Sequence, residues 1–277
     1  MRERGVLGIL TNDPEPVFQQ NVIAGAVEIA RRRGYSAEVQ AADKGVAHLN
    51  ALPFDAKALS GLLVIANVAS DDVLVSLREF GVAVSLVSHY VPTTGIPAII
   101  PDNREGIAQL VQHLIVDCGR RRLVFIQGDM GQNDGVTRDQ AFRQEMMRHN
   151  LSPAEAIILR GDFIPGTAAG RVSELLGTNR DFDAILASDY LMAAAALDVV
   201  QNAGMSVPDD VCIAGFGDGP EAAAADLTTV AADVVELGRR ACRQLIGQID
   251  GLAIRGITVL STELVPRGTT VVREPQP

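Results

Sequence analysis

The sequence contains no recognisable set of residues for covalent catalysis or for binding a metal ion. Its four histidines lie far apart without the His-Glu-x-x-His spacing of zinc hydrolases, and its three cysteines lack metal-ligand spacing. It also has no Gly-x-Ser-x-Gly nucleophile turn and no P-loop lysine. The residues concerned are His48, His89, His113, His149, Cys118, Cys212 and Cys242. We therefore predict no catalytic residue, no metal and no cofactor.

A glycine-rich segment near residue 215 invites comparison with a dinucleotide-binding loop. Gly215-Phe-Gly-Asp-Gly-Pro follows a predicted strand at 211–214, as such a loop would. However, Pro220 occupies the third glycine position, and the pattern predicts a loop without a helix over 218–226. We therefore reject a nucleotide cofactor at this position.

Three polar residues are the main candidates for binding a small molecule. Ser188 and Asp189 directly follow 184–187, an apolar run typical of a strand buried on both faces. Ligands bind beyond the carboxyl ends of strands in open parallel sheets. Asp189 also suits the N-cap of the next helix, and this capping role is favoured over ligand contact. Arg138 starts a predicted helix after a polar loop, either as a bidentate donor to ligand hydroxyls or a carboxylate, or as a surface arginine.

Four further candidates follow other predicted strands. Asn12 lies in a polar loop after the first strand, and Phe18 follows that loop as either a stacking platform or part of a helix-entry staple. His89, next to Ser88, ends the fourth strand, where a lone histidine is more often a loop residue than a switch. Asp218 comes after the strand at 211–214.

Strands and helices alternate along the chain, which predicts an α/β fold with parallel sheets and right-handed crossovers. Two series of units, before and after about residue 101, indicate two similar lobes. Asp102 and Glu105 form a capping box for a helix that ends near Cys118. The predicted strands are 5–11, 36–41, 62–66, 82–87, 96–100, 123–126, 156–159, 184–187, 211–214, 227–230 and 257–260. The predicted helices are 18–33, 45–59, 71–80, 102–118, 137–149, 167–176, one between Asp189 and Gly204, and 233–249. The helix over 45–59 is a weaker prediction, because Pro53 interrupts it. The chain ends in a polar tail.

Composition restricts the partners that this chain can bind directly. The net charge is -10, the pI is about 4.9, and only two lysines are present, so direct binding to a phosphate backbone is disfavoured. The basic runs at 31–33 and 120–122 lie at or after helix ends, where cations complement the helix dipole. An odd number of cysteines indicates buried thiols in a reducing compartment. Without a signal-type start or a membrane-length apolar run, we expect a cytoplasmic protein.

The chain resembles the effector-binding core of the LacI/GalR family of bacterial regulators, whose fold is shared with periplasmic sugar-binding proteins. The resemblance extends from Gly5 to about Thr270 and rests on the order and spacing of many short motifs. They include Asp102-Asn-Arg-Glu-Gly, His113-Leu-Ile, Gly119-Arg-Arg-Arg-Leu-Val-Phe-Ile-Gln-Gly, Arg138 with Phe142, Ala187-Ser-Asp-Tyr-Leu-Met-Ala, Gly204-Met-Ser-Val-Pro-Asp-Asp-Val, Gly215-Phe-Gly-Asp, Leu227-Thr-Thr-Val and Glu236-Leu-Gly-Arg-Arg-Ala.

This resemblance implies two Rossmann-like lobes of the type I periplasmic binding protein kind, joined by three crossings, with a small molecule between them. It places 5–101 and 231–256 in the N-terminal lobe, and 102–230 and 257–272 in the C-terminal lobe. Arg138 matches the family's arginine that grips sugar hydroxyls, Ser188 takes a position usually held by Asn, and Asp189 matches the acidic residue after it. A homodimer and a sugar or related polar effector are also implied, with no membrane contact.

The family's DNA-binding headpiece should precede Gly5, where only Met1-Arg-Glu-Arg stands. We therefore expect DNA binding only through a headpiece outside this chain. Two alternatives are a sensor module of a signalling kinase or cyclic-nucleotide synthase, and a soluble binding protein of a transporter. A doubly wound enzyme is a weaker alternative, because no cofactor fingerprint or nucleophile with a base is present.

Three departures from the family pattern bear on the ligand. Gly217 replaces the family's hydroxyl-binding Asp, Ala232 replaces a common glutamine, and Ser88-His89 replaces an acidic-basic pair. These changes argue against an ordinary hexose or pentose and favour a less polar or differently shaped molecule.

Overall fold

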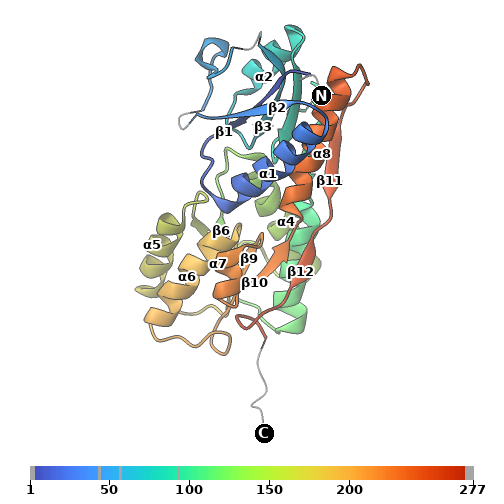
Figure 1. Cartoon of the computed structure of the whole chain (residues 1–277). Helices are drawn as coiled ribbons and strands as arrows, with labels where there is room; N and C mark the ends of the chain where they lie inside the picture. The colour runs from blue at the N-terminus through green and yellow to red at the C-terminus, as the bar shows by residue number, and fades with distance from the viewer. Residues whose placement is uncertain (1–3, 43–44, 56–57, 93, 272–277) are drawn as a thin grey trace. The chain divides into compact units, whose positions relative to one another are not determined.

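The computed structural model describes residues 4–42, 45–55, 58–92 and 94–271. The chain divides into two compact units. The first comprises Met1–Pro101 and Asp233–Leu260, and the second comprises Asp102–Ala232 and Ser261–Pro277. Figure 1 shows strands and helices alternating along each of them.

The first unit is a six-stranded sheet in the order β11-β5-β4-β3-β1-β2, with all neighbouring strands parallel. Its strands are β1 (Val6–Thr11), β2 (Ser36–Ala41), β3 (Leu59–Ile65), β4 (Ala83–Val87), β5 (Ala98–Pro101) and β11 (Ile257–Leu260). Its helices are α1 (Val17–Arg32), α2 (Asp71–Glu79) and α8 (Val234–Ile249).

Alternating apolar residues of this sheet serve two separate cores. Leu63 and Ile65 of β3 pack with α1 and α8, whereas Leu62 and Val64 pack with α2. Because side chains of a strand point alternately to its two faces, a continuous apolar run such as β3 has to be covered by helices on both sides.

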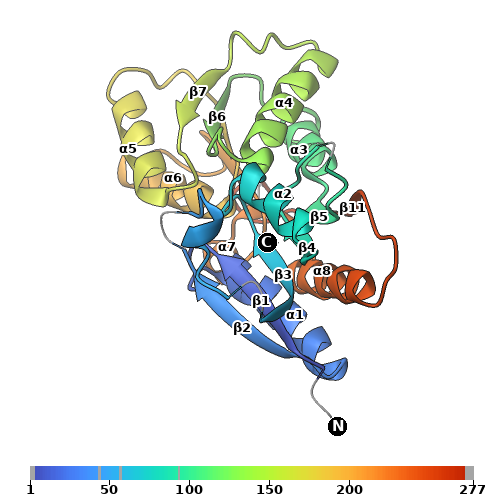
Figure 2. The same ribbon diagram turned by 90° about the horizontal axis from the view of Figure 1, so that it is seen from above.

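Helices α1 and α8 pack so closely that glycine is required on each. An added Cβ at Gly25 would lie 2.0 Å from the Val235 carbonyl oxygen, and one at Gly238 would lie 2.0 Å from the Val22 carbonyl oxygen. The two helices run side by side in Figures 1 and 2. The reciprocal glycines therefore fix the approach of the two backbones.

The second unit is a six-stranded sheet in the order β12-β10-β9-β8-β6-β7, in which only β12 is antiparallel among the described strands. Its strands are β6 (Leu123–Gln127), β7 (Ile157–Arg160), β8 (Ala184–Ala187), β9 (Cys212–Phe216), β10 (Thr228–Ala231) and β12 (Glu263–Val265). Its helices are α3 (Asn103–Gln112), α4 (Asn133–Arg148), α5 (Pro165–Leu176), α6 (Tyr190–Asn202) and the short α7 (Pro220–Ala224).

Helices again cover both faces of this sheet. Helices α3 and α4 bury one face, where the rings of Phe125 and Phe142 stack with centroids 4.3 Å apart. Helices α5 and α6 lie side by side on the other face (Figure 2). Asp102 caps α3 by accepting a hydrogen bond from the Glu105 N–H at 3.1 Å, and a π-helical turn, His113–Asp117, continues that helix.

The predicted α/β class with two parallel-dominated sheets is confirmed. The prediction of a weak helix over 45–59 is wrong: its described residues hold only a short 3-10 turn, Leu49–Ala51, before β3 begins at Leu59. Pro53 lacks the N–H that a continuing helix would need.

The assignment of 257–260 to the second lobe is also wrong. Strand β11 pairs in parallel with β5 and completes the first sheet, and the division between the units falls after Leu260. The second crossing falls between Ala232 and Asp233, slightly later than predicted. An isolated four-residue strand suits either sheet by its residue pattern, so its partner was not readable from the sequence.

Two regions predicted to be irregular contain regular structure. Pro220 opens α7 within the expected loop, in keeping with its preference for the first helical turn, and the expected polar tail contains β12. After β12, the Arg267 guanidinium forms a bidentate pair with Asp218, at 2.8 and 2.9 Å. The Thr228 hydroxyl accepts a hydrogen bond from the Arg267 N–H at 2.8 Å, so the end of the described chain is tied to β9 and β10.

Gly25→Ala is expected to lower the free energy of unfolding by about 1–3 kcal/mol, because a Cβ there would overlap the backbone of α8. The control is Gly170→Ala in α5, where a Cβ would meet no atom within 4 Å. That variant should be neutral or more stable by up to about 1 kcal/mol, since alanine favours helix over glycine. Urea denaturation measures both, and equal effects of the two variants would contradict the close-packing argument.

Asp218→Asn removes the ion pair with Arg267. Because this pair is partly exposed, the free energy of unfolding near neutral pH is expected to fall by only about 1 kcal/mol. Burial alone would raise the pKa of Asp218, but hydrogen bonds from Arg267 and Thr229 hold it below its ordinary 3.8. A depressed carboxyl pKa stabilises the fold above 3.8, and this stabilisation disappears as the pH falls through the folded-state pKa.

Urea denaturation should therefore show that the difference in the free energy of unfolding between Asp218→Asn and the unmodified chain shrinks as the pH falls through the folded-state pKa of Asp218. Glu174→Gln, which breaks an exposed pair with Arg171, serves as the control and should change stability by less than about 0.5 kcal/mol. A difference for Asp218→Asn that persists unchanged at low pH would show that the carboxylate charge is not what stabilises the tail.

Candidate functional site

A buried arginine lies at the centre of the candidate site in the second unit. Arg138 stands on α4, and only 7% of its surface is exposed. A guanidinium so placed has to be compensated by hydrogen bonds or counter-charges, because burying an uncompensated charge is costly. The alternative of a surface arginine is excluded by this burial.

Residues from three segments hold the Arg138 guanidinium. Its Nε donates to the Asn103 side-chain oxygen at 2.7 Å, one terminal nitrogen donates to the Ser188 carbonyl oxygen at 2.7 Å, and the other donates to Asp134 at 3.3 Å. Because a guanidinium has five N–H donors, these three bonds leave two without an acceptor among the described residues. Arg138 is thus fixed in position while keeping donors for a further partner.

Two aromatic rings flank the same guanidinium. Its central carbon lies 3.8 Å from the Phe216 ring centroid and 5.8 Å from that of Phe163, within cation-π range. Each ring packs where only glycine fits, since a Cβ at Gly106 would meet Phe216 at 2.4 Å and one at Gly128 would meet Phe163 at 2.2 Å. Burial lowers the pKa of Arg138, and the nearby Asp134 and Asp189 charges oppose that shift.

Ser188 and Asp189 lie at the carboxyl end of β8, beside Arg138. The Ser188 side chain is fully buried, and its hydroxyl oxygen has no hydrogen-bond partner among the described residues. Asp189 caps α6 by accepting a hydrogen bond from the Met192 N–H at 2.7 Å, so the favoured capping role is present. Burial raises the pKa of Asp189, whereas the Met192 N–H and the Arg138 charge act to lower it.

The first unit carries a similar buried hydroxyl at the carboxyl end of β4. Ser88 is 5% exposed with a left-handed φ of 53°, and its hydroxyl also has no partner among the described residues. Next to it, His89 is buried, with Nε2 3.5 Å from an Asp71 carboxylate oxygen at the start of α2. His89 is therefore a packed residue in contact with α2, not a free loop side chain.

The remaining candidates of the first unit differ in their surroundings. Asn12 is exposed, and its side-chain oxygen accepts a hydrogen bond from the Thr11 hydroxyl at 3.4 Å. Phe18 is half-buried and packs against the core shared by α1 and α8. This packing accounts for Phe18 without a stacking role.

Asp218 is already engaged within the second unit. Both of its carboxylate oxygens are bound by Arg267, and the Thr229 hydroxyl donates to one of them at 2.9 Å. The preceding Gly217 has a φ of 87°, and a Cβ there would lie 3.3 Å from the Tyr190 ring. The segment after β9 thus wraps Tyr190, and its carboxylate serves the fold.

Several residues at these strand ends were not predicted as site residues. In the second unit they are Asn103, Asp134, Phe163 and Phe216, and in the first unit they are Gln19 and Asn67, whose buried side-chain oxygens have no partner among the described residues. The spacing of Asp134 and Arg138, four apart on one helix, was a usable signal. Asp162 and Phe163 have left-handed φ values of 54° and 59°, a strain that favours functional positions but cannot be read from residue types.

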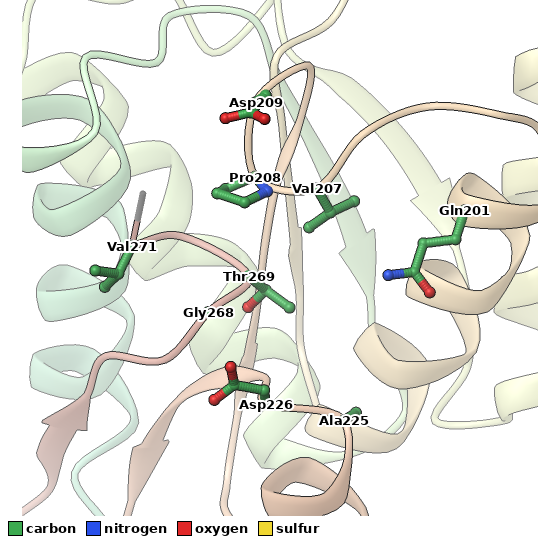
Figure 3. A pocket seen from close by; sticks show the side chains of 9 residues that line it. All are labelled: Gln201, Val207, Pro208, Asp209, Ala225, Asp226, Gly268, Thr269 and Val271. Carbon is green, nitrogen blue, oxygen red and sulfur yellow. The ribbon is translucent and has the colours of Figure 1, made fainter. Parts of the chain in front are cut away.

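A separate pocket of about 390 Å³ lies elsewhere in the second unit (Figure 3). Its lining comes from the end of α6 and from segments that precede β9 and β10, at the opposite ends of the strands from Arg138. The lining residues are Gln201, Val207, Pro208, Asp209, Ala225, Asp226, Gly268, Thr269 and Val271. It is therefore distinct from the site predicted at the carboxyl ends.

The described residues offer neither a metal site nor a membrane-spanning helix. No group of three or more histidine, cysteine or acidic side chains is placed to hold a metal ion within these residues. Over the same part of the chain, none of the helices has the length and apolar character needed to cross a membrane.

Comparison with known proteins agrees with the fold. The family of periplasmic binding protein-like domains matches residues 111–270. The HTH-type transcriptional regulator CelR of Thermobifida fusca is 28% identical over 256 residues, which cover 90% of this chain and 75% of CelR. The repressor PurR of Haemophilus influenzae is 26% identical over 88% of this chain and 73% of its own length.

A solved structure shows the same similarity in three dimensions. The CelR-cellobiose complex superposes with a TM-score of 0.88 at 26% identity, covering 97% of this chain and 85% of the other. The resemblance to the effector-binding core of LacI/GalR-type regulators is thereby confirmed, and the chain belongs to the periplasmic binding protein-like domain family.

Proposed function

We propose that this chain is the effector-sensing core of a LacI-type transcriptional regulator and that a hydroxyl-rich small molecule binds at Arg138. The observation that carries this proposal is the juxtaposition of a fixed guanidinium with two uncommitted N–H donors and the buried, unpaired Ser188 hydroxyl. Buried polar groups in native proteins are nearly always hydrogen-bonded, so a bound ligand is the natural partner for both.

The site is suited to binding a polyol and has no means of activating one. Arg138 donates to ligand hydroxyls, Ser188 can donate and accept, and the oxygen of Asp189 that does not cap α6 can accept. Phe216 and Phe163 hold the guanidinium plane in place, so its two remaining donors have fixed directions. No nucleophile paired with a base stands among these residues, which is why we propose binding without catalysis.

The ligand class follows from the relatives together with the residues of this chain. CelR has been solved with cellobiose, and we infer a sugar or a related polar metabolite for this chain. The acidic residue that the family places after the Gly-Phe pair is here Gly217, while Asp218 is committed to Arg267. We therefore expect the ligand to be held more by the N–H donors of Arg138, and less by carboxylate acceptors, than a typical sugar is.

The cellular context of this function is part of the same proposal. We infer a cytoplasmic homodimer whose geometry responds to the effector, with DNA bound through a headpiece outside this chain. Its net charge of -10 supports the last point, because an acidic surface does not attract a phosphate backbone. Effector control then requires different ligand affinities for the two regulatory states.

Arg138→Ala is expected to weaken ligand binding at least about tenfold, since each hydrogen bond to a charged group contributes about 1.5–3 kcal/mol. Arg138→Lys should also bind weakly, because an ammonium group lacks the planar fork. A thermal-shift screen of sugars, disaccharides including cellobiose, polyols and nucleosides identifies the ligand, and calorimetry then gives the affinities.

Arg148→Ala on the same helix is the matched control, because Arg148 pairs only with Glu145 at the surface and should leave affinity unchanged. Circular dichroism checks that each variant is folded. Unchanged affinity in folded Arg138→Ala would remove Arg138 from the site, and turnover of a compound without stabilisation by any would overturn the sensor assignment.

A further inference from the structure

Two cysteines of the second unit lie beside the chain segment that follows β12. Cys118 comes directly after the π-helical turn that ends α3, and Cys212 is the first residue of β9. The Cys118 thiol donates to the Thr270 carbonyl oxygen at 3.6 Å, and the Ile213 N–H donates to the Thr269 carbonyl oxygen at 3.1 Å. Both cysteines pack in the same apolar core between the sheet and α3, and the Cys118 thiol lies within hydrogen-bonding reach of the Cys212 sulfur.

Cys212 has the surroundings of a stabilised thiolate. The Arg120 Nε donates to its sulfur at 3.2 Å, and the same guanidinium is held by the carbonyl oxygens of Pro208 and Asp209 at 2.6 and 3.2 Å. The Cys118 thiol and Arg120 lower the pKa of Cys212, against burial and the Asp183 charge. A thiolate next to an arginine is the reactive form of cysteine.

Cys118 has a different environment. It is partly exposed, whereas Cys212 is only 1% exposed. His113 presents Nε2 at 3.6 Å from the Cys118 sulfur, while its Nδ1 lies 2.9 Å from an Asp117 oxygen. Interaction with the Cys212 sulfur, followed by burial, raises the pKa of Cys118, so Cys118 keeps the proton while Cys212 carries the charge.

We propose that Cys118 and Cys212 form a reversible oxidation site that a hydroperoxide converts into an intrachain disulfide. The site goes beyond effector binding, because it lies at the far end of α3 and β9 from Arg138. The segments around it, Pro208, Asp209 and Thr269, also line the pocket in Figure 3, which brings solvent to this end of the unit.

The reaction proceeds in two steps that balance. The Cys212 thiolate attacks one peroxide oxygen, the O–O bond breaks, and the other oxygen takes up a proton and leaves as water. The Cys118 sulfur then attacks the sulfur of the Cys212 sulfenic acid, the S–O bond breaks, and the Cys118 thiol proton leaves with the oxygen as a second water. Two thiols are oxidised, one peroxide is reduced, and a thiol reductant restores both cysteines.

The third cysteine provides an internal comparison. Cys242 lies in α8 of the first unit, is 2% exposed, and burial raises its pKa to about 12. A buried cysteine without a nearby cation that lowers its pKa strongly is expected to be inert. Oxidation should therefore be confined to the pair.

The test treats the full reduced chain with hydrogen peroxide, alkylates the remaining thiols and maps the peptides by mass spectrometry. We expect Cys118 and Cys212 to be linked with loss of two hydrogen atoms, Cys242 to be alkylated, and dithiothreitol to reverse the link. Retention of all three free thiols, or a link that includes Cys242, would overturn the proposal.

Variants separate the two roles. Cys118→Ser should form no disulfide and should accumulate a sulfenic acid at Cys212 that dimedone traps, whereas Cys242→Ser should behave like the unmodified chain. Arg120→Gln should slow disulfide formation by about tenfold near neutral pH and shift its pH profile upward, because the thiolate fraction of Cys212 falls. An unchanged pH profile in Arg120→Gln, or no dimedone adduct in folded Cys118→Ser, would refute the assigned roles.

Discussion

The second unit depends on the burial of one positive charge, the Arg138 guanidinium. A cation with 7% exposure is tolerable only with acceptors on several sides, and α3, α4 and the end of β8 each supply one. The Phe216 ring at the end of β9 covers the guanidinium plane. The need to satisfy this charge therefore fixes the relative positions of these four elements. It also holds the guanidinium, with its two remaining N–H donors, in one orientation.

The carboxyl ends of the strands follow one design in both units. Each sheet places a serine directly after a strand, Ser88 after β4 and Ser188 after β8, and each has a buried hydroxyl that finds no partner within the described part of the chain. Ser88 and Phe163 also adopt left-handed backbone conformations, which cost energy and persist only where the surrounding structure enforces them. Unpaired hydroxyls and local strain both reduce stability, so their presence at strand ends is consistent with selection for binding.

The segment that follows β12 serves the stability of the second unit. The Asp218–Arg267 pair and the threonines around Thr228 hold the segment after β12 against the sheet. The same segment contacts Cys118 through the Thr270 carbonyl oxygen and β9 through the Thr269 carbonyl oxygen. Helix α3 and strand β9 each run from this region to the Arg138 site, because Asn103 opens α3 and Phe216 ends β9.

The sequence by itself determined the features that depend on neighbouring residues. Apolar runs identified the strands, the Asp102 and Asp189 caps followed from local hydrogen bonding, and the polar residues after strand ends included Arg138 and Ser188. Only the tertiary structure decided which distant groups would meet. Asp218 was committed to Arg267, 49 residues away, and β11 joined the first sheet, because partner choice depends on shape and burial that no local pattern encodes.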